Sequence, residues 1–287
     1  MSQGAITILG GGSFVAPYLF ARLAAAGRGG AVVGRNPPPL PAGFRPVQAD
    51  LATPGRWRVD PGAVVLGLAP IWVMADAAPA LAAAAQVVAV GSTSVVGKAG
   101  SASAAEQAVV ARLADAEARL ADACVAAGVA CTILRPTMIY DCVSDMNVTR
   151  LARFVARRRM LPIAGRAAGL RQPIHADDVA AAVLAAAGDP AAAGRRFDIA
   201  GPAPMTYRAM ADAVFAALGL PPRYLAVPVA AVAAAAWLGR ALRMPLDERF
   251  AMMLRMNDDL VYDFAPGVAA LGLAPRPFAP RFDFAAG

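Results

Sequence analysis

Short apolar runs recur through the first two thirds of the chain, and most are separated by stretches with helical periodicity. We interpret these runs as buried strands at residues 6–9, 31–33, 64–68, 87–90, 131–134 and 197–200. Strands that alternate with helices predict a parallel sheet with helices on both faces. Right-handed crossovers then place the carboxyl ends of the strands, and any ligand, along one edge. The pattern therefore predicts an α/β fold with a Rossmann-type, doubly wound parallel sheet.

A glycine-rich turn, residues 10–13, joins the first expected strand to an Ala-rich helix expected at 14–26. Backbone amides at such a helix N-terminus favour a pyrophosphate, because no side chain blocks its approach. The usual glycine fingerprint is incomplete, since Ser13 and Ala16 stand at its later positions, although Gly12 could allow the close approach. A tight turn without a ligand is the alternative. The residues expected to bind a dinucleotide here are Gly10, Gly12, Ser13, Phe14 and Val15.

Arg35 follows the second expected strand, where folds that prefer NAD carry an acidic residue for the ribose hydroxyls. A guanidinium suits the 2′-phosphate of NADP by charge and fork geometry, so NADP is favoured over NAD. An ordinary surface arginine is the alternative. Asp50 and Leu51 follow a further expected strand, third in chain order, which ends before residue 49. We expect them to bind the adenine amino group and to cover its ring. A helix N-cap is the other interpretation of Asp50.

The strand pattern loosens after the fifth strand, which divides the chain into two parts. Residues 142–170 contain one basic helix and a Gly-containing loop, and residues 175–187 form a helical pattern. From residue 202, two or three helices are interrupted by prolines. We predict a NAD(P)-binding domain over 1–201, to which the sheet belongs, with 142–170 contributing to a substrate lobe. A small, mostly helical C-terminal substrate lobe is predicted over 202–287.

Composition favours a folded protein with an anionic, small-molecule ligand. Hydrophobic residues make up 58% of the chain and charged residues 16%, which supports a sizeable core. The formal net charge of +7 favours nucleotides and phosphorylated substrates, or weakly attracts acidic lipid. The basic residues between Arg150 and Arg171 are interpreted as a phosphate-binding stretch or, equally, as a solvated helix face. Nucleic acid is not expected, because no aromatic residues interleave with this charge.

Cysteine usage and hydropathy bear on location. Cys124, Cys131 and Cys142 have no metal-type spacing, so no metal site is expected, and they indicate a reducing cytoplasm. No secretion signal is apparent at the start of the sequence. The longest apolar run, residues 224–239, contains Pro228 and is shorter than the roughly 20 residues of a membrane span. Contact with a membrane surface stays an alternative for this run.

Six motifs in order resemble the atypical and extended short-chain dehydrogenase/reductase superfamily, particularly its NAD(P)-dependent epimerase/dehydratase branch. They are LGGGSFVA at 9–16, ADL at 49–51, GLAP at 67–70, VAVGSTSVVG at 88–97, LRPTMIY at 134–140 and RQPIHADDVA at 171–180. The resemblance covers nearly the whole chain. It implies that Ala69 lines the cofactor site, that Ser92 is the hydroxyl beside the substrate with Thr93 next to it, and that the chain forms homodimers through its long helices.

The same resemblance exposes a departure at the catalytic pair. The family uses Tyr-x-x-x-Lys, whose side chains share one helix face and in which the Lys lowers the pKa of the Tyr. Alignment on Glu117 places Val109 and Leu113 at these positions, and no Tyr-x-x-x-Lys occurs anywhere in the sequence, whose only lysine is Lys98. A tyrosine without a cationic neighbour titrates near pH ~10, so little phenolate exists at neutral pH. The usual hydride mechanism therefore lacks its acid–base pair.

Other candidate residues each have a second interpretation. Tyr140 follows a strand and is either an acid or structural, and Asp141 is either a replacement carboxylate or a cap. His175, the only histidine, is read as structural because its segment opens a helix. Arg171 matches an arginine that meets the substrate diphosphate in family members that use nucleotide sugars.

Three functions follow from these observations. The first is an NADP-binding enzyme that reduces, epimerises or dehydrates a nucleotide-linked or other small polar substrate. The second is a non-catalytic NADP-binding sensor or assembly module, suggested by Val109 and Leu113. The third is a peripheral membrane protein that handles a lipid-linked substrate, suggested by the basic stretch and the apolar run.

Overall fold

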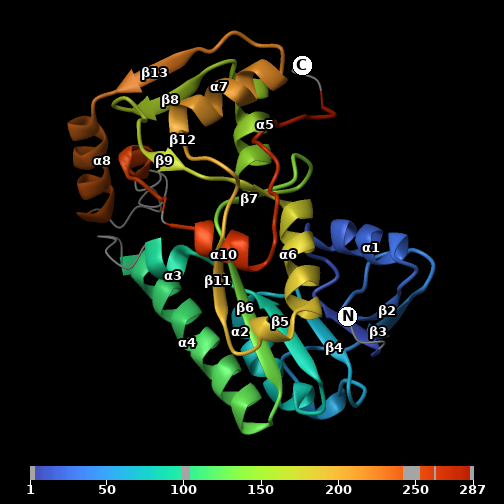
Figure 1. Cartoon of the computed structure of the whole chain (residues 1–287). Helices are drawn as coiled ribbons and strands as arrows, with labels where there is room; N and C mark the ends of the chain where they lie inside the picture. The colour runs from blue at the N-terminus through green and yellow to red at the C-terminus, as the bar shows by residue number, and fades with distance from the viewer. Residues whose placement is uncertain (1–3, 98–103, 242–252, 262, 285–287) are drawn as a thin grey trace. The chain divides into compact units, whose positions relative to one another are not determined.

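The structure, a computed structural model, describes residues 4–97, 104–241, 253–261 and 263–284. These residues form two compact units (Figure 1). Unit 1 comprises residues 1–137, 174–200 and 263–275, and unit 2 comprises residues 138–173, 201–262 and 276–287. Residues 263–275 thus group with the sheet unit rather than with residues 202–262.

Unit 1 is built on one parallel sheet of seven strands in the order β11-β6-β5-β4-β1-β2-β3. The strands are β1 Ile6–Leu9, β2 Gly30–Gly34, β3 Phe44–Gln48, β4 Val64–Gly67, β5 Gln86–Val90, β6 Ala130–Pro136 and β11 Arg196–Ile199. Every neighbouring pair in this sheet is parallel. The predicted Rossmann-type sheet is confirmed, since each expected strand overlaps an observed one. Central strands such as β1 and β4 are buried along their whole length, which explains why they read as continuous apolar runs.

Helices cover both faces of the sheet. They are α1 Ala16–Ala25, α2 Ile71–Ala77, α3 Ser94–Gly97, α4 Ala104–Ala126, α6 Ala176–Gly188 and α10 Ala265–Ala270, with short 3-10 turns η1 Pro54–Arg56, η2 Ala78–Leu81 and η3 Pro190–Ala192. Figure 1 shows the central strands between α4 and α6, and α1 packs with α6 while α2 packs with α4. The long helix α4 buries Leu113, Ala116, Leu120 and Cys124 at helical spacing, and this stripe holds it on the sheet.

Unit 2 combines short helices with small strand pairs. Its elements are β7 Ile139–Tyr140, α5 Val148–Arg158, β8 Leu161–Ala164, β9 Leu170–Arg171, β12 Met205–Thr206, α7 Tyr207–Ala217, β13 Tyr224–Val227, α8 Val229–Ala241 and η4 Arg255–Asn257. Strand β13 pairs in parallel with β8, and β12 pairs antiparallel with β9. The sequence pattern predicted the basic helix α5 but not β8, which lies in the stretch read as a loop.

The apolar run at residues 224–239 is divided between a strand and a helix. Its first part is β13, and α8 begins directly after Pro228. The fixed φ of proline suits the start of a helix, and the ring prevents a strand from continuing. Among the described residues, no helix combines the length and the hydropathy that crossing a membrane requires.

Candidate functional site

The strand order of unit 1 reverses between β1 and β4, and this reversal defines the candidate site. The chain proceeds outward from β1 to β2 and β3 and then returns to β4 on the other side of β1. In open α/β sheets, a crevice forms beyond the carboxyl ends of the strands at this point, and dinucleotides bind there. The amides of Leu68 and Ala69 both donate to the Leu9 carbonyl, at 2.8 and 3.1 Å, and hold the two strand ends together.

Gly10 makes the close approach of these strand ends feasible. Its φ is +88°, a conformation that side chains disfavour. A Cβ at this position would lie 2.4 Å from the Ala69 backbone nitrogen. The first glycine of the turn is therefore required by the fold itself. Ala69, which the resemblance assigns to the cofactor, is buried against this turn.

The remainder of the glycine-rich turn presents free amides. Ser13 donates its own amide to the Gly10 carbonyl at 2.9 Å, and its hydroxyl accepts from the Val15 amide at 3.3 Å. Within the part of the chain that the structure describes, the amides of Gly11, Gly12 and Phe14 donate to no acceptor. A Cβ on Gly12 would meet no atom within 4 Å, so the backbone is open on that side. Open amides before the ten-residue helix α1 form an anion-binding arrangement.

Arg35 lies just beyond the carboxyl end of β2, beside this turn. The last residues of β2 neighbour the turn directly, because Gly10 donates to the Val33 carbonyl at 3.4 Å. The Arg35 side chain is exposed and forms no ion pair with any described residue. It is therefore available to an anionic group bound at the turn.

Asp50 and Leu51 lie beyond the carboxyl end of β3. The Asp50 carboxylate accepts from the Ala52 amide at 3.1 Å, and its carbonyl accepts from the Trp57 indole at 3.1 Å. Leu51 is buried in the core cluster. One carboxylate oxygen of Asp50 thus organises the local turn, as the cap interpretation expects, and the exposed side chain keeps its other oxygen for a ligand.

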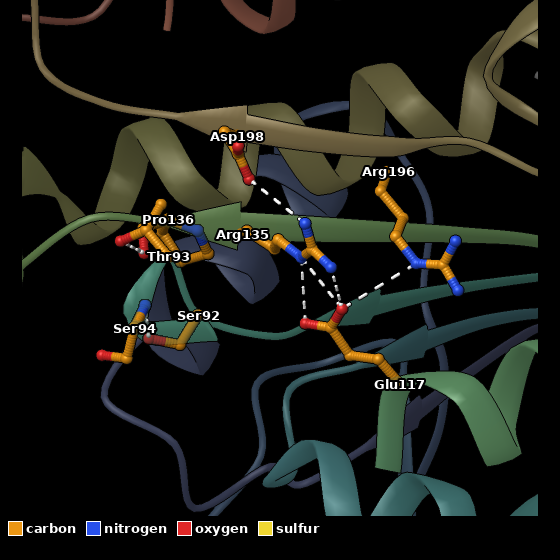
Figure 2. A network of polar contacts seen from close by, with 8 residues as sticks. All are labelled: Ser92, Thr93, Ser94, Glu117, Arg135, Pro136, Arg196 and Asp198. Atoms are coloured by element: carbon orange, nitrogen blue, oxygen red, sulfur yellow. Dashed lines mark hydrogen bonds and ion pairs between the residues drawn. The ribbon is translucent and has the colours of Figure 1, made fainter. Parts of the chain in front are cut away.

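Ser92 and Thr93 follow β5 at the same edge of the sheet (Figure 2). The Thr93 hydroxyl donates to the Pro136 carbonyl at 3.2 Å, and the Ser92 hydroxyl accepts from the Ser94 amide at 3.1 Å. These bonds fix both side chains at the strand end, which is the turn chemistry that the sequence left as an alternative. The Ser92 hydroxyl keeps its proton to donate, so it can also bind a carbonyl or hydroxyl of a substrate.

A buried ion-pair network supports this edge of the sheet, and sequence reasoning missed it. Arg135 on β6 donates to both carboxylate oxygens of Glu117 on α4, from Nε to Oε1 at 3.1 Å and from Nη2 to Oε2 at 2.5 Å. Arg196 and Asp198 on β11 lie further out, each with a contact of 3.8 Å, to Glu117 and to Arg135 respectively. Figure 2 shows the Arg135 guanidinium between the two carboxylates. An arginine inside the apolar motif at 134–140 was the signal available in the sequence.

The network has a clear electrostatic origin. Burial by itself lowers the pKa of Arg135, but the hydrogen bonds and charge of Glu117, together with Asp198, reverse this effect and leave the pKa raised. The Glu117 side chain is only 2% exposed. A Cβ on Gly91 would lie 2.6 Å from its Oε1, so the glycine after β5 makes room for the carboxylate. Glu117 thus positions α4 against the sheet and is not aimed at a ligand.

Helix α4 is apolar at the two positions to which the resemblance assigns a catalytic pair. Val109 is 50% exposed and Leu113 is 7% exposed, both on α4. Neither side chain can donate or accept a proton. Lys98, the only lysine, lies outside the described residues.

Tyr140 belongs to unit 2, where it is buried in an apolar cluster. It is 2% exposed, and its ring meets Phe278 edge to face at a centroid distance of 4.9 Å. Cys142, Val148 and Met210 belong to the same cluster. These surroundings favour the structural interpretation of Tyr140, and its role as an acid stays a prediction.

Arg171, also in unit 2, directs its guanidinium at backbone carbonyls. Its Nη1 donates to Leu170 at 2.8 Å and to Asp258 at 2.6 Å, and its Nη2 donates to Arg255. The side chain is nearly buried, and this burial lowers its pKa, although nearby Tyr207 and Asp258 act in the opposite direction. Much of the donor capacity that a substrate diphosphate would need therefore ties residues 255–258 to β9.

Asp141 and His175 both act as local caps. Asp141 Oδ1 accepts from the amides of Val143, Ser144 and Asp145 at 2.8–2.9 Å. Burial raises the pKa of Asp141, but these backbone hydrogen bonds outweigh it and lower the pKa overall. His175 Nδ1 accepts from the Asp177 amide at 3.1 Å at the start of α6. The expectation that the His175 segment opens a helix is confirmed, and this cap favours the structural interpretation of His175.

Comparison with known proteins adds the fold relationship. No protein-family model matches the sequence, and no curated protein matches it.

Several solved structures resemble the structure of this chain. MoeE5 in complex with UDP-glucose and NAD has 18% identity and a TM-score of 0.69, covering 96% of this chain and 94% of that one. UDP-glucuronic acid 4-epimerase from Bacillus cereus, in complex with UDP-glucuronic acid and NAD, has 14% identity and a TM-score of 0.69, covering 96% and 95%. UDP-glucose 4-epimerase from Thermotoga maritima, with UDP-glucose, has 16% identity and a TM-score of 0.68, covering 96% and 94%. The chain therefore has the fold of these proteins over nearly its full length.

Proposed function

We propose that this protein binds a nicotinamide dinucleotide at the glycine-rich turn and acts as an oxidoreductase or epimerase on a nucleotide-linked substrate. The observation that carries the proposal is the set of open amides of Gly11, Gly12 and Phe14 at the point where the strand order reverses. Structures with this fold, MoeE5 and the Bacillus cereus epimerase, were solved with NAD and a UDP-sugar, which supports both halves of the proposal.

The proposed cofactor site distributes three tasks among its residues. The turn amides and the positive end of the α1 dipole bind the pyrophosphate. Asp50 and Leu51 bind the adenine, and Arg35 binds the 2′-phosphate that distinguishes NADP from NAD. The exposed guanidinium of Arg35, which forms no ion pair with the described residues, supports NADP, whereas the NAD in the similar structures supports NAD. When bound, the nicotinamide supplies a hydride or accepts one.

Ser92 is the residue we propose for the reacting end of the substrate. Its hydroxyl is held by the Ser94 amide and can donate a hydrogen bond to a substrate oxygen, with Thr93 beside it as a binding residue. Val109 and Leu113 cannot supply a proton, so we propose that the Ser92 hydroxyl, water or the substrate itself supplies it. Tyr140 stays the acid that the sequence predicts. Arg171 remains the predicted contact for the substrate diphosphate.

The cofactor proposal is tested by thermal unfolding with NADP and NAD in separate titrations. A ligand that binds only the folded state at 100 times its Kd stabilises it by about 2.7 kcal/mol, which raises the unfolding temperature by several degrees. We expect a larger shift with NADP, and we expect Arg35→Glu to reverse the preference. Gly12→Val, which places a side chain on the open side of the turn, is expected to abolish both shifts. No shift with either coenzyme would refute the proposal.

A non-catalytic NADP-binding module is the second candidate, and the apolar pair Val109 and Leu113 favours it. The two functions differ in turnover. Absorbance at the nicotinamide band, measured with the coenzyme and a panel of UDP-sugars, separates them. Coenzyme binding without turnover for any substrate would support the module, whereas turnover lost in Ser92→Ala would establish the enzyme.

A further inference from the structure

The outer face of α5 in unit 2 carries a concentrated positive charge that the proposed function does not use. A groove of about 470 Å³ runs along it. Asp145 and six other residues line this groove. We define these six as the α5 outer face: Met146, Arg150, Arg153, Phe154, Arg157 and Arg158. Figure 1 locates α5 in unit 2.

Helix α5 is strongly amphipathic, so this face is fixed outward. Its inner face buries Val148, Ala152 and Val155 in the apolar clusters of unit 2. A helix anchored by such a stripe cannot rotate its opposite face into the core. The arginines are therefore held on the surface by the packing of the inner face.

No acidic residue compensates the charge within this part of the sequence. Residues 146–171 contain seven arginines and neither Asp nor Glu. The side chains of Arg150, Arg157 and Arg158 are exposed and form no hydrogen bond or ion pair with the described residues. Arg153 donates to the Val143 carbonyl at 2.9 Å and lies over the Phe284 ring. The face thus keeps three guanidinium groups that have no partner in the described part of the chain.

The one carboxylate in the groove is already engaged. Asp145 Oδ1 accepts from the amides of Asn147 and Val148, at 2.9 and 2.6 Å, and its Oδ2 accepts from the Thr149 hydroxyl. It caps the N-terminus of α5 and is buried, so it does not pair with the arginines. Arg150 lies in the first turn, where the helix dipole disfavours a cation, and helix stability therefore gives no reason for its charge.

Large apolar side chains protrude among these arginines. Met146 is 70% exposed and Phe154 is 41% exposed, and Val143 nearby is 60% exposed. Soluble surfaces seldom place such side chains together without a partner. Guanidinium groups interleaved with protruding apolar groups suit the boundary between lipid headgroups and acyl chains.

We propose that the α5 outer face docks on an anionic lipid bilayer. The arginines bind headgroup phosphates, and Met146 and Phe154 enter the boundary between headgroups and acyl chains. From Arg150 to Arg158 the charges extend over about 12 Å of helix. This length reaches several lipid headgroups and exceeds the size of a single soluble phosphate group.

The test is co-sedimentation of the full chain with vesicles of phosphatidylcholine alone or mixed with phosphatidylglycerol. We expect binding to the anionic vesicles at low salt, weakened at high salt, and none to the neutral vesicles. The variant Arg150→Gln/Arg157→Gln/Arg158→Gln should bind about a hundredfold more weakly, at about fivefold per arginine. The control variant Arg45→Gln/Arg56→Gln/Arg58→Gln removes the same charge from exposed residues of unit 1 and should bind as the native chain does.

A second measurement keeps the proposal testable if the triple variant does not fold. The variant Met146→Cys is labelled with a thiol-reactive dye whose emission wavelength reports the polarity around it. The native cysteines are buried and do not compete for the dye. We expect a blue shift on anionic vesicles for a dye at residue 146 and none for a dye at Arg56→Cys. Equal loss of binding in both triple variants, or no binding at low salt, would overturn the proposal. Binding to polyglutamate but not to anionic vesicles would assign the face to an acidic protein segment and would also overturn it.

Discussion

Replacing Glu117 by Gln tests whether the buried ion-pair network holds α4 on the sheet. Arg135 makes hydrogen bonds of 2.9 and 2.5 Å to Glu117 Oε2, and its side chain is 17% exposed. After the substitution, the remaining carboxylate is Asp198 at 3.8 Å, which is too far for a hydrogen bond. Removing one partner of a buried pair costs about 3–5 kcal/mol, because the other charge stays buried without compensation.

Removing both charges should cost much less than removing one. In Glu117→Leu/Arg135→Met, apolar side chains fill the space of the buried pair, and such replacements are often neutral or stabilising. Asp198 and Arg196 lose only contacts of 3.8 Å, and their side chains, 32% and 42% exposed, stay accessible to water. The double variant is therefore expected to unfold close to the native chain. The coupling between the two sites, from the four members of the cycle, should be at least about 2 kcal/mol.

The assay is urea unfolding followed by circular dichroism for the native chain, both single variants and the double variant. Arg119→Gln on the same helix is the matched control. Its side chain is 48% exposed and pairs with Asp76 and Asp115, so its loss should cost at most about 1 kcal/mol. A Glu117→Gln cost as small as that of the control, or a double variant as unstable as the sum of the single ones, would refute the reasoning.

Three further predictions concern the turn, the cap at Asp141 and Arg171. Gly10→Ala should lower the free energy of unfolding by more than about 2 kcal/mol, of which about 1–2 kcal/mol comes from the φ of +88° and the rest from the clash with the Ala69 backbone. Gly12→Ala is the control and should leave the free energy of unfolding unchanged, and thermal melts of both variants measure the difference. The lowered pKa of Asp141 means that its stabilisation is present above the unfolded value of about 3.9 and is lost as pH falls through the folded value. Asp141→Asn should therefore cost about 1–3 kcal/mol at pH ~7 and almost nothing at pH ~2, and an equal cost at both, in urea titrations, would contradict this. Arg171→Lys should lower the melting temperature in the absence of substrate, because an ammonium cannot reach all three carbonyls that the guanidinium binds. An unchanged melting temperature would contradict this structural role and favour a role of Arg171 in substrate binding.

Much of unit 1 could be predicted because its local patterns agree with its tertiary structure. Buried parallel strands have continuous apolar sequences, the turn after β1 is rich in glycine, and the buried residues of α4 recur at helical spacing. These features depend on residues close in sequence. For the same reason, the basic helix α5 was expected at its observed place.

Contacts between residues far apart in the sequence could not be predicted from the sequence alone. Glu117 and Arg135 look like ordinary polar residues until α4 and β6 bring them together, and β8 is recognisable as a strand only beside β13, some sixty residues later. The guanidinium of Arg171 could have met a phosphate or the protein's own carbonyls with equal chemical justification. Residue types fix what a side chain can bind, but the folded chain decides which partner lies within reach. The sequence alone determined the parallel sheet, the alternation of its strands with helices, and the glycine turn. The tertiary structure decided the order of the strands in the sheet and which charges are buried, paired or left open to a ligand.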